Sequence, residues 1–480
     1  MGAMRPASRM RPVELDDEDA AGPDAGPPRD GSGGDGDGRA GDRPRWWPWL
    51  LVALVLVVGA GLVATGASER GARERADAFG RLPGVVRPLE DAPEELWRVA
   101  ADGPTPVVGA GGGVVTVSGA DGPWTVRSAD AATGDVRWSV TVTEPSGAGF
   151  ETVAVACVGD PDPAAPLLCL WRDPNVVYGS AGESTPYVPP TNVLALDAGD
   201  GSRVGSWQVE GSVLAAVRHD DDVVVATGLA DRHVLVERRS GADGAVLWSW
   251  TSPTELVEAG GLRAAPTLVG DGDVIALVAV STALLDVRTG RVVEAGPPGR
   301  QILVGDLPDG GFVTWTSGRG ARLRDADGST RGEIAGLPSV VVGDRSVDVL
   351  LVDAGNRVLG VRTADGSAVW ELSTSLSPVA VADGVVVMAG AASVGAVDGT
   401  EGRLLWEREL TGELRAGPLT DGFHVLVPEP DGARRTTLVA RGLRDGVESW
   451  RVALPTGVQA VTAVAGHVVA RTGTEVVVIG

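Results

Sequence analysis

The sequence contains no lysine, so all 41 basic residues are arginines, and it has only four histidines. We attach no functional meaning to the missing lysine. The histidines, His219, His233, His424 and His467, stand alone and lack the spacing of metal ligands. No G-x-S-x-G or P-loop pattern is present either. The sequence therefore predicts no metal centre, no serine-hydrolase site and no P-loop nucleotide site.

Acidic residues outnumber basic ones, and the formal net charge is −23. Ten acids and seven arginines lie in residues 1–45, and residues 46–67 carry no charge, so a charge of −20 remains downstream. Such a negative field repels nucleic acid and anionic lipid and favours solubility. We therefore expect no nucleic-acid partner.

One uncharged apolar segment, Trp46 to Gly66, is long enough to cross a bilayer of about 30 Å as a helix. The preceding residues 1–45 are rich in Gly, Asp, Pro and Arg and have too few large apolar side chains to form a core. We predict a disordered tail at 1–45, a transmembrane helix at 46–66 and a polar linker at 67–94. The alternative, a cleaved signal peptide, conflicts with the long region before the apolar run.

The two cysteines, Cys157 and Cys169, flank a turn rich in Pro and Asp, with strand-like residues on both sides. If these arms pair as a hairpin, the sulfurs can form a disulfide, which suits an oxidising compartment. Two buried free thiols are the alternative, and the sequence does not choose between them. A long domain with such a disulfide belongs outside the cytoplasm. We therefore expect a single-pass protein of the cytoplasmic membrane, with its N-terminus cytoplasmic and its large domain extracytoplasmic.

Beyond residue 95 one pattern recurs, in which a strand-like run turns at a Gly and a Trp usually follows four residues later. Copies include SADAATGDVRWSV, VRTADGSAVWELS and VDGTEGRLLWERE, and eight such Gly turns are spaced 36 to 67 residues apart. A period near 40 with several short strands per unit is typical of a β-propeller. Seven tryptophans of this type are predicted to pack structurally between blades: Trp97, Trp138, Trp207, Trp248, Trp370, Trp406 and Trp450.

Residues 95–480 resemble the PQQ-like, or quinoprotein-like, propeller family, whose units carry an x-D-x-x-T-G-x-x-x-W core. The family includes quinoprotein alcohol dehydrogenases and the propeller lipoprotein of the outer-membrane β-barrel assembly machinery, and its propellers are typically eight-bladed. We therefore expect an all-β, eight-bladed propeller of four-stranded antiparallel sheets. A count of three-strand groups, with EELWRVA supplying the missing outer strand of the last unit, gives nine blades instead, and nine stays open.

The resemblance to quinoprotein dehydrogenases implies a quinone cofactor, a Ca²⁺ ion, an Asp base and often a disulfide between adjacent cysteines. Here the cysteines are twelve positions apart, and the chain has only three asparagines. No compact cluster of acids and amides has the spacing of a Ca²⁺ loop. The acids mostly occupy turn positions just before a Gly, where turn chemistry explains them: Asp200, Asp243, Asp327, Asp365 and Asp445. We expect no catalysis and no cofactor.

The longest spacing comes from an insertion, WRDPNVVYGSAGESTPYVPPTN, which holds both tyrosines, Tyr178 and Tyr187. Loops on rigid scaffolds often carry recognition, and Tyr is a favoured contact residue, although the insertion could equally be a decoration that packs on its own blade. The leading hypothesis is a non-catalytic scaffold or ligand-sensing domain with a protein partner in the cell envelope. The alternatives are a membrane-bound quinoprotein oxidoreductase and a cell-wall carbohydrate-binding module, and the sequence leaves the identity of any small-molecule ligand unknown.

Overall fold

The computed structural model describes residues 78–480, apart from 102–106, 120–122, 144–154, 161, 163, 173–175, 179–183, 187–189, 257–265, 271, 298–299, 308, 317–319, 415 and 433–434. The predicted tail 1–45 and the predicted membrane helix 46–66 lie outside these residues. Within them, no helix has the length and hydropathy needed to cross a bilayer.

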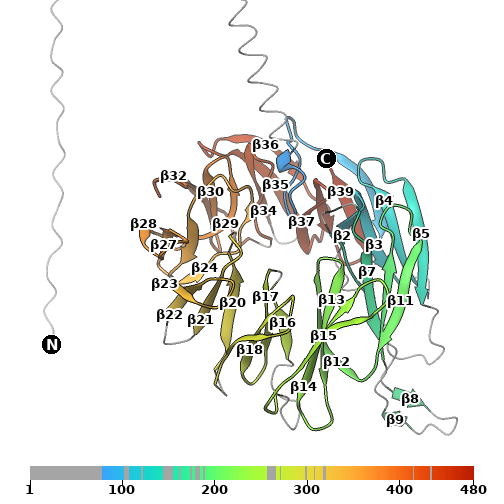
Figure 1. Ribbon diagram of the computed structural model, residues 1–480. Coiled ribbons are helices and arrows are strands. Elements are labelled where there is room, and N and C mark those ends of the chain that lie inside the picture. The colour runs from blue at the N-terminus through green and yellow to red at the C-terminus, as the bar shows by residue number, and fades with distance from the viewer. Residues whose placement is uncertain are drawn as a thin grey trace, which may run out of the picture. The chain divides into compact units, whose positions relative to one another are not determined.

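The described residues form nine antiparallel sheets arranged as the blades of a ring (Figure 1). Within blades 1 to 8, the four strands follow one another outward from the centre in chain order.

The strands of blades 1 to 3 are, in that order, β2 (Val108–Ala110), β3 (Gly113–Ser118), β4 (Trp124–Asp130) and β5 (Val136–Thr143); β6 (Ala156–Val158), β7 (Leu167–Arg172), β10 (Thr191–Leu196) and β11 (Arg203–Val209); and β12 (Ser212–His219), β13 (Asp222–Gly228), β14 (Val234–Ser240) and β15 (Val246–Thr251). Blades 4 to 6 contain β16 (Thr267–Val269), β17 (Val274–Val278), β18 (Thr282–Asp286) and β19 (Val292–Ala295); β20 (Ile302–Asp306), β21 (Phe312–Thr316), β22 (Gly320–Arg324) and β23 (Thr330–Ile334); and β24 (Leu337–Pro338), β26 (Leu350–Asp353), β27 (Arg357–Val361) and β28 (Ala368–Ser373). Blades 7 and 8 contain β29 (Ser377–Ala382), β30 (Val385–Ala389), β31 (Ser393–Asp398) and β32 (Leu404–Glu409); and β33 (Leu419–Thr420), β34 (His424–Asp431), β35 (Arg435–Gly442) and β36 (Glu448–Ala453).

Blade 9 is closed by the two ends of the propeller sequence. Its first three strands are β37 (Ala460–Val464), β38 (His467–Arg471) and β39 (Glu475–Ile479), and its outer strand is β1 (Glu95–Ala100). Strand β1 pairs antiparallel with β39, with Trp97 opposite Val478. The prediction that EELWRVA supplies the missing strand is confirmed.

The predicted count of eight blades is wrong, and the alternative of nine is confirmed for the part of the chain that the structure describes. The reason is that each Gly turn joins the third and fourth strands of one blade. Blade 9 has no such turn because its fourth strand comes from the start of the domain. Eight turns and one closing strand therefore make nine blades.

The hydrophobic core lies between blades rather than within them. The second strand of blade 3, β13, is buried almost throughout, and so is the corresponding strand of blade 7, β30. Both faces of such a strand are covered by neighbouring blades, so an unbroken run of Val is favoured there. The outer strands alternate instead, as in β28, where Trp370 is buried between exposed neighbours. The ring closes where Val114 of blade 1 packs with Val469, Val476 and Val478 of blade 9.

Residues 78–94 pack onto the propeller, unlike the free linker that the sequence predicts for 67–94. Phe79, Val85 and Val86 are buried in the cores between blades 7 and 8 and between blades 8 and 9. The backbone N–H of Val86 donates to Thr420 O at 3.0 Å, and that of Arg87 donates to Gly466 O at 2.8 Å. These few apolar side chains, spread among polar ones, find a surface that the linker sequence alone does not reveal. We call residues 78–94 the entry segment.

Candidate functional site

Six of the seven predicted indoles join their own blade to the next one. Each lies on an outer strand, and its Nε1–H donates to a backbone carbonyl in the turn of the following blade. The bonds are Trp97 to Ala131 (2.9 Å), Trp138 to Ala198 (3.0 Å), Trp207 to Gly241 (3.0 Å), Trp248 to Val287 (2.6 Å), Trp370 to Gly399 (2.8 Å) and Trp406 to Leu443 (3.0 Å). We call this contact the indole joint.

The turn glycine of the next blade forms the other half of the indole joint. Gly402, for example, has a φ of +69°, and a Cβ there would lie 2.5 Å from Cδ2 of Trp370. Gly is therefore required twice, by the left-handed backbone and by the ring stacked on it.

Trp450 departs from this arrangement. The next blade is blade 9, which has no turn between its third and fourth strands and so offers no carbonyl in the usual place. Within the described residues, the buried Nε1 of Trp450 has no hydrogen-bond partner. Its ring instead lies 6.4 Å from the ring of His424, centroid to centroid, at a tilt of 57°.

Blades 4 and 5 have no Trp on their outer strands, and other contacts replace the indole. Val293 of β19 faces the turn glycine of blade 5, Gly328, and the neighbouring Glu294 accepts a bond of 2.7 Å from Arg324 of blade 5. In β23, Gly332 occupies the Trp position. A Cβ there would lie 2.2 Å from the carbonyl oxygen of Asp365, so the backbones of blades 5 and 6 meet directly.

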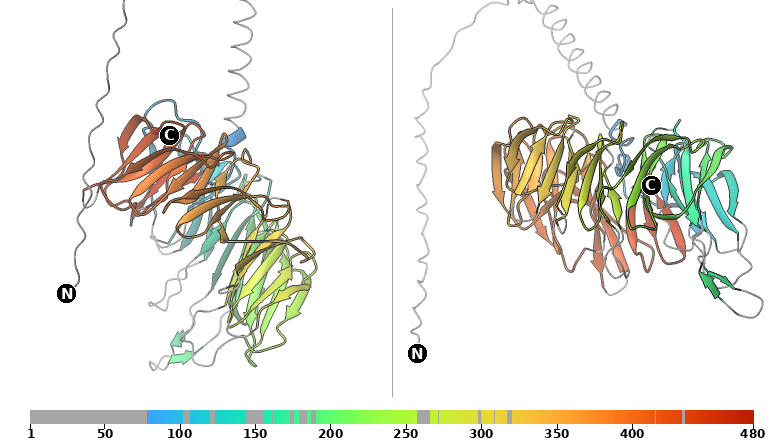
Figure 2. Two further views of the ribbon diagram at one scale, coloured as in Figure 1. Left: turned by 90° about the vertical axis from the view of Figure 1, so that its left-hand side faces the viewer. Right: turned by 60° about the horizontal axis from the view of Figure 1, so that its bottom comes forward.

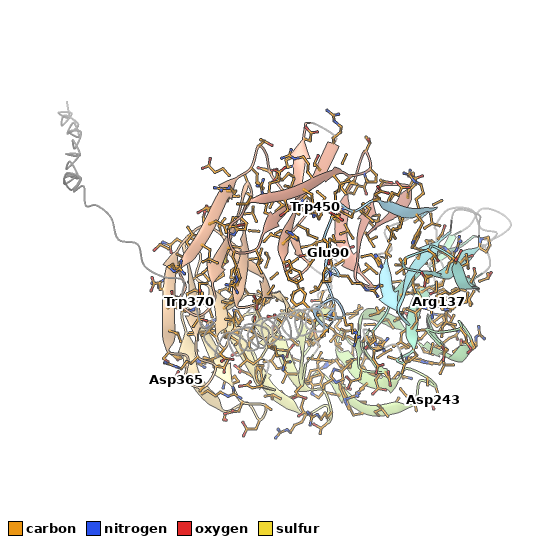
Figure 3. The ribbon with its side chains drawn as sticks, turned by 90° about the horizontal axis from the view of Figure 1, so that it is seen from above. Glu90, Arg137, Asp243, Asp365, Trp370 and Trp450 are labelled. Atoms are coloured by element: carbon orange, nitrogen blue, oxygen red, sulfur yellow. A yellow bond between two sulfur atoms is a disulfide. The ribbon has the colours of Figure 1, made fainter. Side chains whose placement is uncertain are left out.

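The acids singled out as turn residues are turn residues. Each carboxylate accepts the backbone N–H two positions further on: Asp200 from Ser202 (2.8 Å), Asp243 from Ala245 (3.1 Å), Asp327 from Ser329 (2.8 Å), Asp365 from Ser367 (2.9 Å) and Asp445 from Val447 (3.0 Å). The bonds to Ser202 lower the pKa of Asp200, and those to Ser367 lower the pKa of Asp365. Figure 3 shows Asp243 and Asp365 at the outer rim of the ring, far from one another. These acids do not form a common site.

Cys157 and Cys169 form a disulfide in blade 2. They lie directly opposite one another in the paired strands β6 and β7. The bond closes a separation of 12 residues, which would stabilise the fold by roughly 2–3 kcal/mol through the unfolded chain. Both residues are buried, so the disulfide is a structural bond of the blade core.

The insertion that carries the tyrosines lies between β7 and β10 of blade 2. It contains a two-stranded hairpin, β8 (Val176–Tyr178) paired with β9 (Ser184–Pro186), with Tyr178 opposite Ser184. Tyr187 lies outside the described residues. The hairpin projects away from the sheet of its blade (Figure 2).

The two faces of the ring differ in what they present. One face carries the first-to-second and third-to-fourth strand turns of the blades, and we call it the turn face. The entry segment lies on it, because Leu89 N–H donates to Asp421 (3.1 Å) in the first turn of blade 8. The other face carries the second-to-third strand connections, and we call it the loop face. Since antiparallel strands alternate in direction, the β8–β9 hairpin belongs to the loop face, opposite the entry segment (Figure 2).

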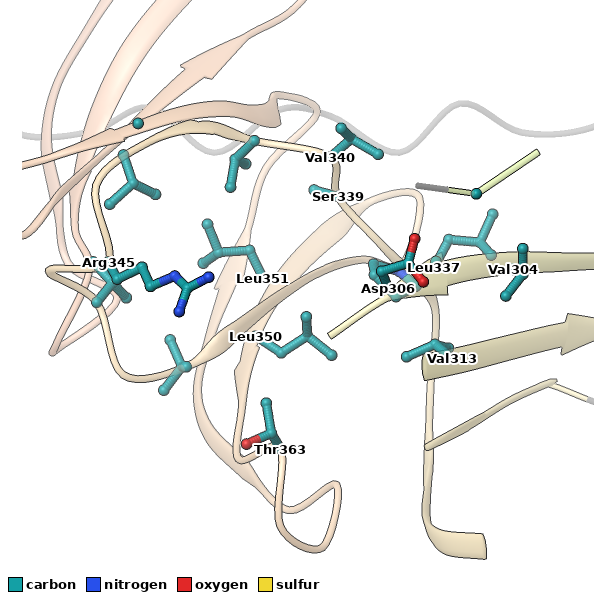
Figure 4. Close-up of a pocket in the computed structure, with 18 of the residues that line it drawn as sticks. Val304, Asp306, Val313, Leu337, Ser339, Val340, Arg345, Leu350, Leu351 and Thr363 are labelled. Carbon is teal, nitrogen blue, oxygen red and sulfur yellow. The ribbon is translucent and has the colours of Figure 1, made fainter. Parts of the chain in front are cut away.

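A pocket of about 990 Å³ opens among the inner strands of blades 3 to 7. It forms because the inner strand of blade 6, β24, has only two residues. The chain then leaves this blade, and β25 (Val342–Gly343) pairs in parallel with β29 of blade 7, which becomes a five-stranded sheet. We call residues 339–349 the crossing segment. Beside it, the half-buried Leu350 and the buried Leu351 of β26 line the pocket (Figure 4).

Most residues that line the pocket are Val or Leu, and Trp315 also lines it. Three of them are unusually exposed for aliphatic side chains: Val269 (45%), Leu303 (40%) and Val340 (91%). Arg345 extends from the crossing segment toward Leu351, and Asp306 lies on the other side (Figure 4). The spacing of 38 residues between Gly328 and Gly366 is ordinary for this chain. Sequence reasoning missed the pocket because the repeat period does not change there.

The described residues contain no group of three His, Cys, Asp or Glu side chains placed to hold a metal ion. The best-organised polar cluster is in blade 8, where the buried carboxylate of Asp421 accepts from the N–H of Leu89, of Phe423 (2.9 Å) and of His424 (2.6 Å). It also bonds His424 Nδ1 at 3.0 Å, which raises the pKa of His424. This cluster holds the entry segment and needs no ligand to explain it.

Within the described residues, the fold is a nine-bladed β-propeller. The family model described as outer membrane protein assembly factor BamB matches residues 354–480. That match confirms the resemblance to the PQQ-like repeat over that segment, which runs from the end of β26 to the end of blade 9. No curated protein matches the chain significantly.

Similar solved structures include BamB and two alcohol dehydrogenases. BamB from Moraxella catarrhalis is 17% identical, with a TM-score of 0.44 over 81% of this chain and 99% of that one. A europium-containing methanol dehydrogenase is 11% identical (TM-score 0.40; 80% and 85% covered). A quinohemoprotein alcohol dehydrogenase from Comamonas testosteroni is 13% identical (TM-score 0.39; 81% and 76% covered).

Proposed function

We propose that the protein is a non-catalytic protein-interaction scaffold of the cell envelope, anchored in the cytoplasmic membrane by residues 46–66. Its partner binds the loop face through the β8–β9 hairpin. The observation that carries this proposal is the position of the hairpin on the face opposite the entry segment.

When fully extended, residues 67–77 would span at most about 40 Å, so an anchor at 46–66 would tether the propeller to the membrane at short range. The disulfide between Cys157 and Cys169 suits an oxidising compartment outside the cytoplasm.

The acids and indoles also support a non-catalytic role. The five acids discussed above hold turns, and six indoles hold blades together, so their chemistry is used within the fold. A scaffold requires a rigid frame and one distinctive surface, and the insertion in blade 2 supplies the latter.

Photo-crosslinking in intact cells tests the partner surface. A photoreactive residue at Thr185, in β9, should give a defined adduct with an envelope protein. The matched control carries the same residue at Ala392, on the loop face of blade 7, and should give no such adduct. Equal adducts at both positions would refute the assignment of the hairpin.

Deletion of residues 175–189 completes the test. The variant should lose the partner while its thermal transition stays nearly unchanged, because β7 and β10 pair without the insertion. Dye-linked alcohol oxidation by the full chain, after incubation with quinone and Ca²⁺, would contradict the non-catalytic part of the proposal.

A further inference from the structure

We propose that the pocket beside the crossing segment binds a small apolar molecule that carries one carboxylate, such as a medium-chain fatty acid. This site is separate from the hairpin surface and does not depend on the scaffold role. It lies on inner strands of blades 3 to 7, whereas the hairpin belongs to blade 2.

The size and lining of the pocket fit a small apolar ligand. Its volume of about 990 Å³ falls within the range of about 300–1,000 Å³ found for ligand pockets, and Val and Leu form most of its wall. Val269, Leu303 and Val340 come from three successive blades and leave much of their surface in water. An apolar ligand that covers them removes this surface from solvent, which favours binding.

The wall of the pocket is held in place by specific bonds, so the cavity is preformed. Asp344 N–H donates to Val381 O (3.1 Å), and its carboxylate accepts from the N–H of Ser346 (3.0 Å) and of Asp383 (3.0 Å). Ser346 Oγ in turn accepts from Gly384 N–H at 2.7 Å. These bonds fix the crossing segment to blade 7 before any ligand arrives. A preformed pocket avoids the entropy cost of ordering its wall on binding.

One group of the pocket, the guanidinium of Arg345, can hold an anionic head. Among the described residues that line the pocket, Arg345 is the one cation. No carboxylate of a described residue lies within ion-pair distance of the Arg345 guanidinium. Two acids of the wall are engaged by backbone N–H groups, Asp306 by Gly272 (3.2 Å) and Asp344 by Asp383. Asp348, which is exposed, also lines the pocket, so acids outnumber Arg345 there. A ligand carboxylate can bind only in direct contact with Arg345, where the guanidinium offers it several donors.

Quenching of Trp315 by brominated ligands tests the proposal. Bromine quenches indole fluorescence on contact, and Trp315 lines the pocket. The full chain in lipid nanodiscs is titrated with ω-bromoundecanoic acid, the matching alcohol and the matching amine. A Trp315→Phe variant is titrated in parallel. Subtracting its quenching from that of the parent protein leaves the contribution of Trp315 and removes that of the other tryptophans, including those near the lipid. The difference between the two proteins should saturate with the acid at about tenfold lower concentration than with the alcohol.

Arg345→Gln is the matched variant for the charge. Arg345 is exposed, so the substitution should leave the thermal transition unchanged. The variant should bind the acid and the alcohol equally well. Its affinity for the alcohol should equal that of the parent protein. Three results would overturn the proposal: tighter binding of the amine than of the acid, an acid preference that survives Arg345→Gln, or quenching that Trp315→Phe does not reduce.

Discussion

The blades that keep the indole joint differ instructively from those that lose it. Between blades 6 and 7, Trp370 lies on Gly402 and donates to Gly399, and the same geometry recurs at five other joints. Between blades 4 and 5 an ion pair and a Val take its place, and between blades 5 and 6 the backbones meet at Gly332. The pocket lies on the inner strands of blades 3 to 7, which include these irregular blades. Where the indole joint is kept the same geometry recurs around the ring, and where it is lost each pair of blades uses a different contact.

Removal of one indole tests the regular joints and should have the largest effect. Trp406 is buried, and Trp406→Ala should lower the free energy of unfolding by about 3–5 kcal/mol through the cavity it leaves. Val293→Ala, at the joint between blades 4 and 5, should cost only about 1 kcal/mol. Urea denaturation of both variants measures the difference. Equal losses would mean that the two kinds of joint are energetically alike.

Substitution of the turn glycine tests the other half of the same joint. Gly402→Ala should lower the free energy of unfolding by about 2–4 kcal/mol, because the added Cβ is strained by the positive φ and also meets Trp370. Gly457→Ala is the control, since Gly457 has a φ of +80° and open space around the added atom. It should show the backbone cost alone, about 1 kcal/mol. A similar loss in both variants would show that the indole can move aside.

The ion pair between blades 4 and 5 should contribute less. The Arg324 side chain is 13% exposed and that of Glu294 is 29% exposed. Glu294→Gln keeps the shape and removes the charge, and it should lower the free energy of unfolding by about 1 kcal/mol. A loss as large as that of Trp406→Ala would contradict the idea that irregular joints are weaker.

His424 tests the incomplete joint of blade 8, where the change should be smallest. The hydrogen bond to the Asp421 carboxylate raises the pKa of His424 above its ordinary value of about 6.5. A raised folded-state pKa stabilises the folded protein. This contribution is fully present when the pH is below the unfolded-state pKa of about 6.5, and it is lost as the pH rises through the folded-state pKa. Stability should therefore fall over this window in the parent protein, and fall less in His424→Gln.

For His467 the predicted dependence of stability on pH has the opposite sign. Burial lowers the pKa of His467, so its contribution is present at higher pH and is lost as the pH falls through the unfolded value of about 6.5. Thermal melts of the single His467→Gln variant from pH 5 to 9 separate the two residues. Identical pH profiles for the parent and His424→Gln would show that Asp421 does not stabilise the protonated form of His424.

Much of the frame could be predicted from residue pattern. The Gly-to-Trp spacing identified the turns and outer strands, and EELWRVA identified the closing strand, because these features depend on residues close in sequence. The blade count was wrong because turns and blades differ by one when the ring closes on its own ends. The docking of Phe79 and Val86 was missed because isolated apolar residues in a polar segment give no periodic signal.

The candidate sites were predicted less well than the frame. The β8–β9 insertion was visible in the sequence as extra length, although the face on which it lies depends on strand direction. The pocket was not visible at all. Val269 lies on blade 4, Trp315 on blade 5 and Arg345 in the crossing segment, and they share no motif, so nothing local connects them.

The sequence by itself determined the repeated antiparallel unit, since backbone turns and strand burial follow from the order of Gly, Val and Trp within about forty residues. Tertiary structure decided what happens between units: the number of blades, the acceptor of each indole, the docking of the entry segment and the cavity beside the crossing segment. The physical reason is the distance along the chain over which each interaction acts. Turn and strand preferences act between neighbours in the chain, whereas closure and packing depend on surfaces that meet only when the ring has formed.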